Sequence, residues 1–150
     1  MRTLEHIGLF ADPLPAPPRE LPSAPGCFRW VILPVAERAQ AYLHANCSMC
    51  HRPLGPTVSG IDFRWGVAFE DRGILDAPPS GETLGIDDSR LFAPGDPDRS
   101  VIPARMSDLG AHRMPPLASE RVDDEAVELI REWIGAHGAN TARADWSTYE

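Results

Sequence analysis

Apolar residues recur at helical spacing in residues 35 to 46, and this pattern predicts the first main helix of the chain. Glu37 and Arg38 face outward in such a helix, while the apolar positions fall on one side: Val35, Ala36, Ala39, Tyr42 and Leu43. We therefore expect this helix to present a core-facing stripe.

The same spacing predicts a terminal helix over residues 123 to 137. Its apolar stripe consists of Ala126, Val127, Ile130, Trp133 and Ile134. Three acidic residues, 123 to 125, stand at its positive end, and Gly138 is predicted to stop it. Between these helices, six glycines interrupt every apolar run of residues 52 to 92, so an irregular wrap is expected there.

Residues 1 to 34 contain seven prolines, and this density predicts an extended, Pro-rich arm without a helix. Its short apolar stretch, residues 4 to 10, is expected either to dock on the domain or to belong to a preceding domain that is absent, and docking is favoured. The domain itself is assigned to residues 35 to 138. Residues 139 to 150 are expected to form a polar tail.

Composition narrows the class of protein. With 150 residues and 43% hydrophobic content, the chain has material for one domain. A net charge of -8 argues against nucleic acid as a partner, because no basic stripe could neutralise phosphates. Since no run of 18 apolar residues exists, no membrane span is expected. The partners are therefore expected to be other proteins.

Cys47, Cys50 and His51 form a Cys-x-x-Cys-His motif, the signature of covalent haem attachment. On a helical turn the two thiols and the imidazole share one face, so they can hold one flat ligand. A zinc site would need a further ligand from Cys27, His44 or His112. A thioredoxin-type pair would begin a helix, whereas this motif ends one. Neither competitor requires the histidine.

The second axial ligand of such a haem decides what the protein can do. Met114 is the first choice, because Pro115 and Pro116 stiffen the backbone that follows it. His112 is the main rival and is otherwise expected to be exposed. Met106, on a short helix after Ser100, is expected to pack in the core, and His137 is the fourth candidate.

These residues make the chain resemble a class I c-type cytochrome, in particular the monohaem domains found alone or appended to bacterial periplasmic dehydrogenases. The resemblance spans residues 35 to 137 and rests on four stretches: 39 to 53 around the motif, 93 to 100, 114 to 117 and 129 to 134. It implies an all-α cytochrome c-like fold with one covalent haem c. It also implies thioethers at Cys47 and Cys50 and axial ligation of the iron by His51 and Met114. Pro103 departs from the apolar residue common there, but the first turn of a helix tolerates it.

The implied function is one-electron transfer without enzymatic activity of its own, from a dehydrogenase to an oxidase or another cytochrome. A five-coordinate haem that senses or reacts with a peroxide or a diatomic gas is the alternative, with His112 and Arg113 as distal polar groups. Covalent haem attachment of this type resembles a process that occurs outside the bacterial cytoplasm, so export to the periplasm is expected. Because no signal peptide is visible, the chain is expected to be a mature or truncated piece of an exported protein.

Several neighbours of the haem are also expected. Aromatic candidates for ring packing are Phe63, Trp65 and Phe69, and arginine candidates for the propionates are Arg52, Arg64 and Arg90. Tyr42 and Trp133 are expected to meet where the two main helices cross. Cys27 is expected to be a thiol without a role. Because the porphyrin supplies much of the apolar centre, the haem-free protein should be poorly folded.

Overall fold

A computed structural model of the chain describes residues 2–21, 33–57, 59–117 and 120–140. Its α-helices are α1 (Arg2–His6), α2 (Val35–Cys47), α3 (Val101–Ser107) and α4 (Asp124–Asn140). Two 3₁₀ helices, η1 (Phe69–Arg72) and η2 (Pro97–Arg99), lie between α2 and α3. Within the described ranges there is no β-strand, only two isolated bridges. The predicted all-α class is therefore confirmed.

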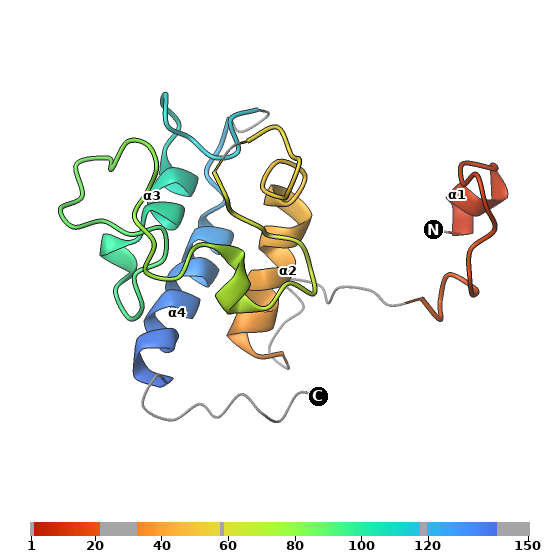
Figure 1. The fold of residues 1–150 in the computed structure, drawn as a ribbon, viewed down its shortest axis with the longest axis horizontal. Coiled ribbons are helices and arrows are strands. Elements are labelled where there is room, and N and C mark those ends of the chain that lie inside the picture. Colours follow the sequence, from red (N-terminus) through yellow and green to blue (C-terminus); the bar gives the residue numbers. More distant parts are fainter. Residues whose placement is uncertain (1, 22–32, 58, 118–119, 141–150) are drawn as a thin grey trace.

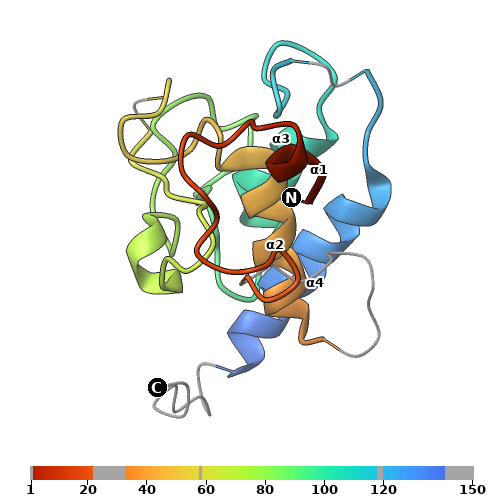
Figure 2. The same cartoon turned by 90° about the vertical axis from the view of Figure 1, so that its right-hand side faces the viewer.

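The body of the molecule is built on α2 and α4, which cross against one another, with α3 beside α4 (Figures 1 and 2). Most of the two predicted stripes is buried: Ala39, Tyr42 and Leu43 from α2, and Ala126, Ile130, Trp133 and Ile134 from α4. The other predicted positions, Val35, Ala36 and Val127, are only partly buried, and Leu129 is buried in addition. Asp123 stands just before α4, and its Oδ1 accepts a hydrogen bond from the Ala126 amide at 3.1 Å. The helices thus form where the periodicity predicted them.

Aromatic rings fill the space beside α4. Phe92 is fully buried, and its ring centroid lies 4.8 Å from that of Trp133 and 5.0 Å from that of Phe69. Tyr42 and Trp133 belong to the same core cluster, although the Tyr42 hydroxyl donates to Asp123 Oδ2 at 3.3 Å. The aromatic partners of Trp133 come from the wrap between residues 52 and 92, which is irregular as expected apart from η1.

Gly138 does not stop α4, which continues to Asn140. The glycine serves a different purpose, because a Cβ at this position would collide with the backbone of Gly95. The Gly95 amide donates to the Ile134 carbonyl at 2.9 Å, so the chain before η2 rests directly on the last turns of α4. The prediction from Gly138 was wrong because its constraint comes from a segment 43 residues away.

The arm differs from its prediction in two ways. Residues 2–6 form the short helix α1, because the prolines of the arm begin only at position 13. Residues 2–21 also stand apart from the body (Figure 1), with Ile7 and Leu9 each 64% exposed, so the favoured docking is not observed. Residues 22–32, which include Cys27, and the tail from 141 to 150 lie outside the described residues.

Candidate cofactor site

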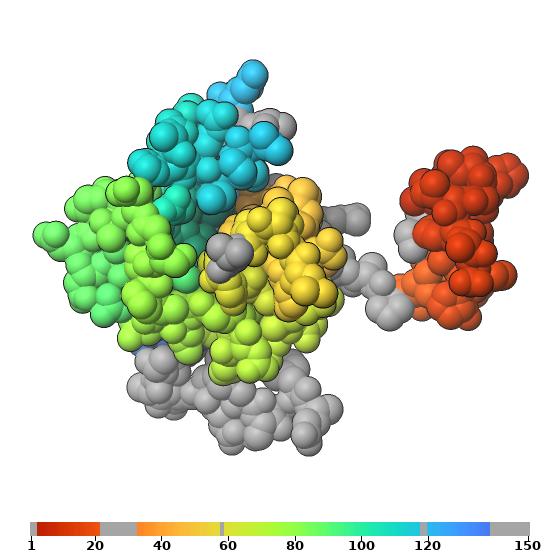
Figure 3. Space-filling model, turned by 45° about the horizontal axis from the view of Figure 1, so that its top comes forward, coloured from red at the N-terminus to blue at the C-terminus, as the bar shows by residue number. Residues whose placement is uncertain are grey.

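A cavity of about 200 Å³, which widens to solvent at its mouth, opens where α2 ends. It is the hollow seen between the yellow, green and cyan segments in Figure 3. Cys47, His51 and Met114 all line this cavity, and most of the other lining side chains are apolar: Tyr42, Leu43, Ile61, Phe63, Leu91, Val101, Ile102, Met106 and Pro115. Three of the four predicted site residues therefore meet in one place.

The attachment turn continues the end of α2. The Cys50 and His51 amides both donate to the Cys47 carbonyl, at 3.1 and 2.9 Å, so the motif follows the helix as predicted. Cys47 and His51 line the cavity, and Cys50 is half-buried beside it. Gly55 is required just behind this turn, because a Cβ there would collide with the Cys50 carbonyl. The backbone after the motif thus packs tightly against the Cys50 carbonyl.

His51 is oriented by its neighbours. Its Nδ1 lies 3.0 Å from Ser59 Oγ, so His51 donates this hydrogen bond when the proton is on Nδ1 and accepts it from the hydroxyl in the other tautomer. The Phe63 ring lies edge-on, 5.5 Å away between centroids. Burial lowers the pKa of His51, which favours the neutral imidazole. A neutral ring held through Nδ1 keeps Nε2 available as a metal ligand.

The pKa of the Cys47 thiol differs from that expected of a redox-active cysteine. Burial, together with the neighbouring Cys50, raises its pKa to about 12. A thioredoxin-type nucleophile needs the opposite, a lowered pKa that yields thiolate at neutral pH. The local environment therefore weighs against a disulfide oxidoreductase.

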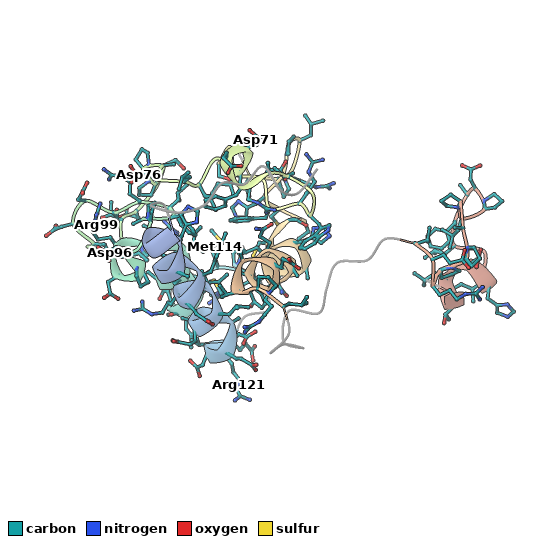
Figure 4. The ribbon with its side chains drawn as sticks, turned by 90° about the horizontal axis from the view of Figure 1, so that it is seen from below. Asp71, Asp76, Asp96, Arg99, Met114 and Arg121 are labelled. Carbon is teal, nitrogen blue, oxygen red and sulfur yellow. The ribbon has the colours of Figure 1, made fainter. Side chains whose placement is uncertain are left out.

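Met114 reaches the cavity from a different wall, formed by α3 and the loop after it. Its amide donates to the Arg105 carbonyl at 2.9 Å, and the Met114-Pro115 peptide bond is cis. Figure 4 shows Met114 over the interior of the body, whereas Asp76, Asp96 and Arg99 lie toward one edge. The Met114 loop, residues 108 to 117, therefore delivers a thioether to the same space as the imidazole.

The rival ligands are distributed unevenly. Met106 lines the cavity and is partly buried against the core, as expected for a packing residue. His112 is outside the cavity lining, and its amide donates to Asp108 Oδ2 at 3.0 Å. His137 lies elsewhere, 4.7 Å from the Phe69 ring between centroids, and burial lowers its pKa. Of the four candidates, the two methionines are positioned to contact a ligand in the cavity.

Most of the expected ring and propionate neighbours lie elsewhere. Phe63 lines the cavity, but Trp65 is 38% exposed and Phe69 packs on Phe92 and Trp133. Of the three arginines, Arg52 is exposed, and the other two form ion pairs with the acidic side chains of Asp62, Asp76 and Asp88. None of the three lines the cavity.

Two other arginines that the sequence pattern did not single out have unusual surroundings, although Arg72 does not line the cavity. Arg105 lines the cavity, on the same face of α3 as Val101 and Ile102, and that spacing of three to four residues was its only sequence signal. Arg72 is fully buried and donates to Gln40 Oε1 at 3.1 Å and to the Val67 carbonyl at 2.9 Å. Its Nε and Nη1 have no partner in the described part of the chain.

The zinc interpretation gains no support from the described ranges. Three or more histidine, cysteine, aspartate or glutamate side chains do not gather there in a way that could hold a metal ion. His44, one of the proposed ligands, accepts a hydrogen bond at Nδ1 from the Trp65 amide at 3.0 Å. Cys27 lies outside the described residues.

Comparisons with protein-family models, with curated proteins and with solved structures each found no match. Among the described residues, no helix is both long enough and apolar enough to cross a membrane. The case for a cofactor therefore rests on the donor set itself. Two thiols on one turn, an oriented neutral imidazole and a thioether from another wall, around a largely apolar space, fit a covalently attached haem.

Proposed function

We propose that this chain is a class I c-type cytochrome that carries single electrons through one covalent haem c. The observation that carries the proposal is the shared cavity, in which Cys47 and His51 of one turn meet Met114 from a distant loop. Cys50, on the same turn, would supply the second thioether. The all-α body with long loops supports the finer proposal of a cytochrome c-like fold.

When bound, the haem would supply an iron that changes between the ferrous and ferric states, and a thioether ligand favours the ferrous one. The protein holds the imidazole through the contact between His51 and Ser59 and surrounds the site with apolar side chains. Both features stabilise a defined coordination and a raised potential. If His51 and Met114 both held the iron, no position would remain for a substrate, so we assign electron transfer rather than catalysis.

The residues that line the cavity also bear on the alternative, a five-coordinate haem that binds a small ligand. Such a site needs polar groups near the vacant position. His112 and Arg113, the groups considered for this role, do not line the cavity, whereas the thioether of Met114 does. We therefore propose His/Met coordination, with redox proteins as partners and the periplasm as the compartment.

The test is to produce the protein in a periplasm that contains the haem maturation machinery, and to compare Met114→Ala with Met106→Ala. Both substitutions shorten a methionine of the same cavity, which makes Met106→Ala the matched control. Met114→Ala should abolish the weak far-red band of ferric thioether ligation and lower the potential by on the order of 0.1 V, within the roughly 0.8 V range set by axial ligands. Met106→Ala should keep both properties.

Two results would contradict the proposal. A colourless parent protein, or one whose haem is removed by acidic acetone, would show that no covalent haem is attached. An unchanged far-red band in Met114→Ala would show that Met114 is not the ligand. Loss of the band in Met106→Ala would identify Met106 as the ligand instead.

A further inference from the structure

The Met114 loop has little packing of its own to hold it over the cavity. Pro115, Pro116 and Leu117 are exposed, Leu117 to 80%, and Leu109 is 46% exposed. A thioether ligand nevertheless has to stay at bonding distance, because a displacement of about 1 Å is enough to impair a positioned group. The polar contacts of the loop must therefore supply its position.

Arg105 makes contacts of this kind to two separate segments. Its backbone carbonyl accepts the Met114 amide at 2.9 Å, and its Nη1 donates to the His112 carbonyl at 3.3 Å. Its Nη2 donates to the Glu82 carbonyl at 2.8 Å. One guanidinium thus links the Met114 loop to the segment of residues 79 to 82, part of which lines the cavity.

The link starts from a well-anchored helix. Val101 and Pro103 of α3 are buried, and α3 packs against α4. Gly81 lies close to the guanidinium, so that a Cβ on this residue would sit 3.6 Å from Arg105 Nη2. The planar fork of arginine suits two diverging carbonyls, a geometry that the single ammonium of lysine cannot reproduce.

Asp108 supplies a second, local restraint. Its Oδ1 accepts the Gly110 amide at 2.8 Å and its Oδ2 accepts the His112 amide at 3.0 Å. These bonds shape the turn that leads from α3 into the loop, but they stay within the loop. The Arg105 side chain, by contrast, joins the loop to the segment of residues 79 to 82.

We propose that Arg105 is a positioning residue that keeps Met114 on the iron by tying its loop to residues 79 to 82. This inference rests on the proposed function, since it assumes that Met114 is the ligand. Without the tie, the loop is expected to open more often and to expose the iron to external ligands. Arg105 touches neither the iron nor a substrate in this role.

The experiment compares haem-loaded Arg105→Met with haem-loaded Arg113→Met. The control removes a neighbouring arginine whose side-chain bonds, to the Pro116 and Leu109 carbonyls, remain inside the loop. Arg105→Met should keep its covalent haem and bind carbon monoxide in the reduced state about tenfold faster, because the two guanidinium bonds that tie the loop to residues 79 to 82 are lost. Its far-red band should disappear at a lower temperature, whereas Arg113→Met should match the parent protein in both respects.

Arg105→Lys keeps the charge and covers the case in which Arg105→Met does not fold. It should bind carbon monoxide at an intermediate rate, because one ammonium can hold one of the two carbonyls. Equal rates in Arg105→Met, Arg105→Lys and the parent would overturn the inference, even if the unfolding temperature fell, because the residue would then be merely structural. A parent protein with covalent haem but no Met114-dependent band would instead refute the ligand assignment, and a parent without haem would refute the proposed function.

Discussion

Beside α4, buried groups meet directly: the Phe92 ring contacts Trp133 and Phe69, and the Gly95 backbone rests on Gly138. On the cavity side, the Met114 loop depends on hydrogen bonds that Arg105 donates and Asp108 accepts, and much of the loop faces solvent. In the first region, side chains and backbone of the protein itself fill the space. The second surrounds a space, and its walls gain their apolar contacts only when that space is filled.

If the protein carries electrons as proposed, the packed region and the cavity side have different tasks. Close packing resists deformation, which suits the part of the molecule that must stay constant while the charge of the iron changes. Hydrogen-bonded loops adapt more readily, which suits a wall that has to admit a cofactor during maturation. Substitutions in the two regions should therefore affect different properties.

The largest expected effect on folding comes from Phe92→Ala in the packed region. Phe92 is fully buried, so its removal should lower the free energy of unfolding by about 3 to 5 kcal/mol through lost burial and a cavity. Chemical denaturation of the haem-loaded protein measures this change. Leu54→Ala, at a fully exposed position, is the control and should stay within about 0.5 kcal/mol. Similar losses in the two variants would show that the packed region is not the more stable one.

A smaller effect is expected from two glycines of α4 that differ only in their surroundings. Gly138→Ala places a Cβ against Gly95 and should lower the free energy of unfolding by about 1 to 3 kcal/mol. Gly135→Ala meets no atom within 4 Å and should raise it by up to about 1 kcal/mol through helix propensity. Thermal unfolding of both variants checks the opposite signs, and two stabilised variants would disprove the close contact.

The smallest effect concerns the pH dependence of the free energy of unfolding, through Asp62, which lies between the cavity-lining residues Ile61 and Phe63. Side-chain hydrogen bonds from Arg64, followed by its backbone amide, hold the pKa of Asp62 below its ordinary value of 3.8 despite burial. Because the unfolded chain then binds the proton more readily, this contribution to stability is present above the ordinary pKa. It is lost as the pH falls through the lower, folded value.

Asp62→Asn should therefore flatten the acid limb of the stability curve between roughly pH 5 and pH 2. Arg64→Met, which removes the partner in the 2.7 Å ion pair, should flatten it as well. Urea titrations at several pH values make the measurement. An acid limb as steep as that of the parent in both variants would show that this pair does not set it.

Local patterns predicted the helices well but misjudged the residues whose role depends on distant contacts. The stripes of α2 and α4 were readable because helical periodicity depends on neighbours three and four positions apart. Gly138 was misjudged for the opposite reason, because its role is defined by Gly95, which is far away in the sequence.

The sequence by itself determined the all-α class, the two main helices and the spacing that puts two thiols and an imidazole on one turn. Each of these follows from interactions over a few residues. Only the tertiary structure decided that Met114 and Met106 share the cavity with His51 while His112 and His137 do not, and that Arg105 links the Met114 loop to the segment of residues 79 to 82. Those arrangements depend on segments far apart in the chain, which packing and hydrogen bonds bring together.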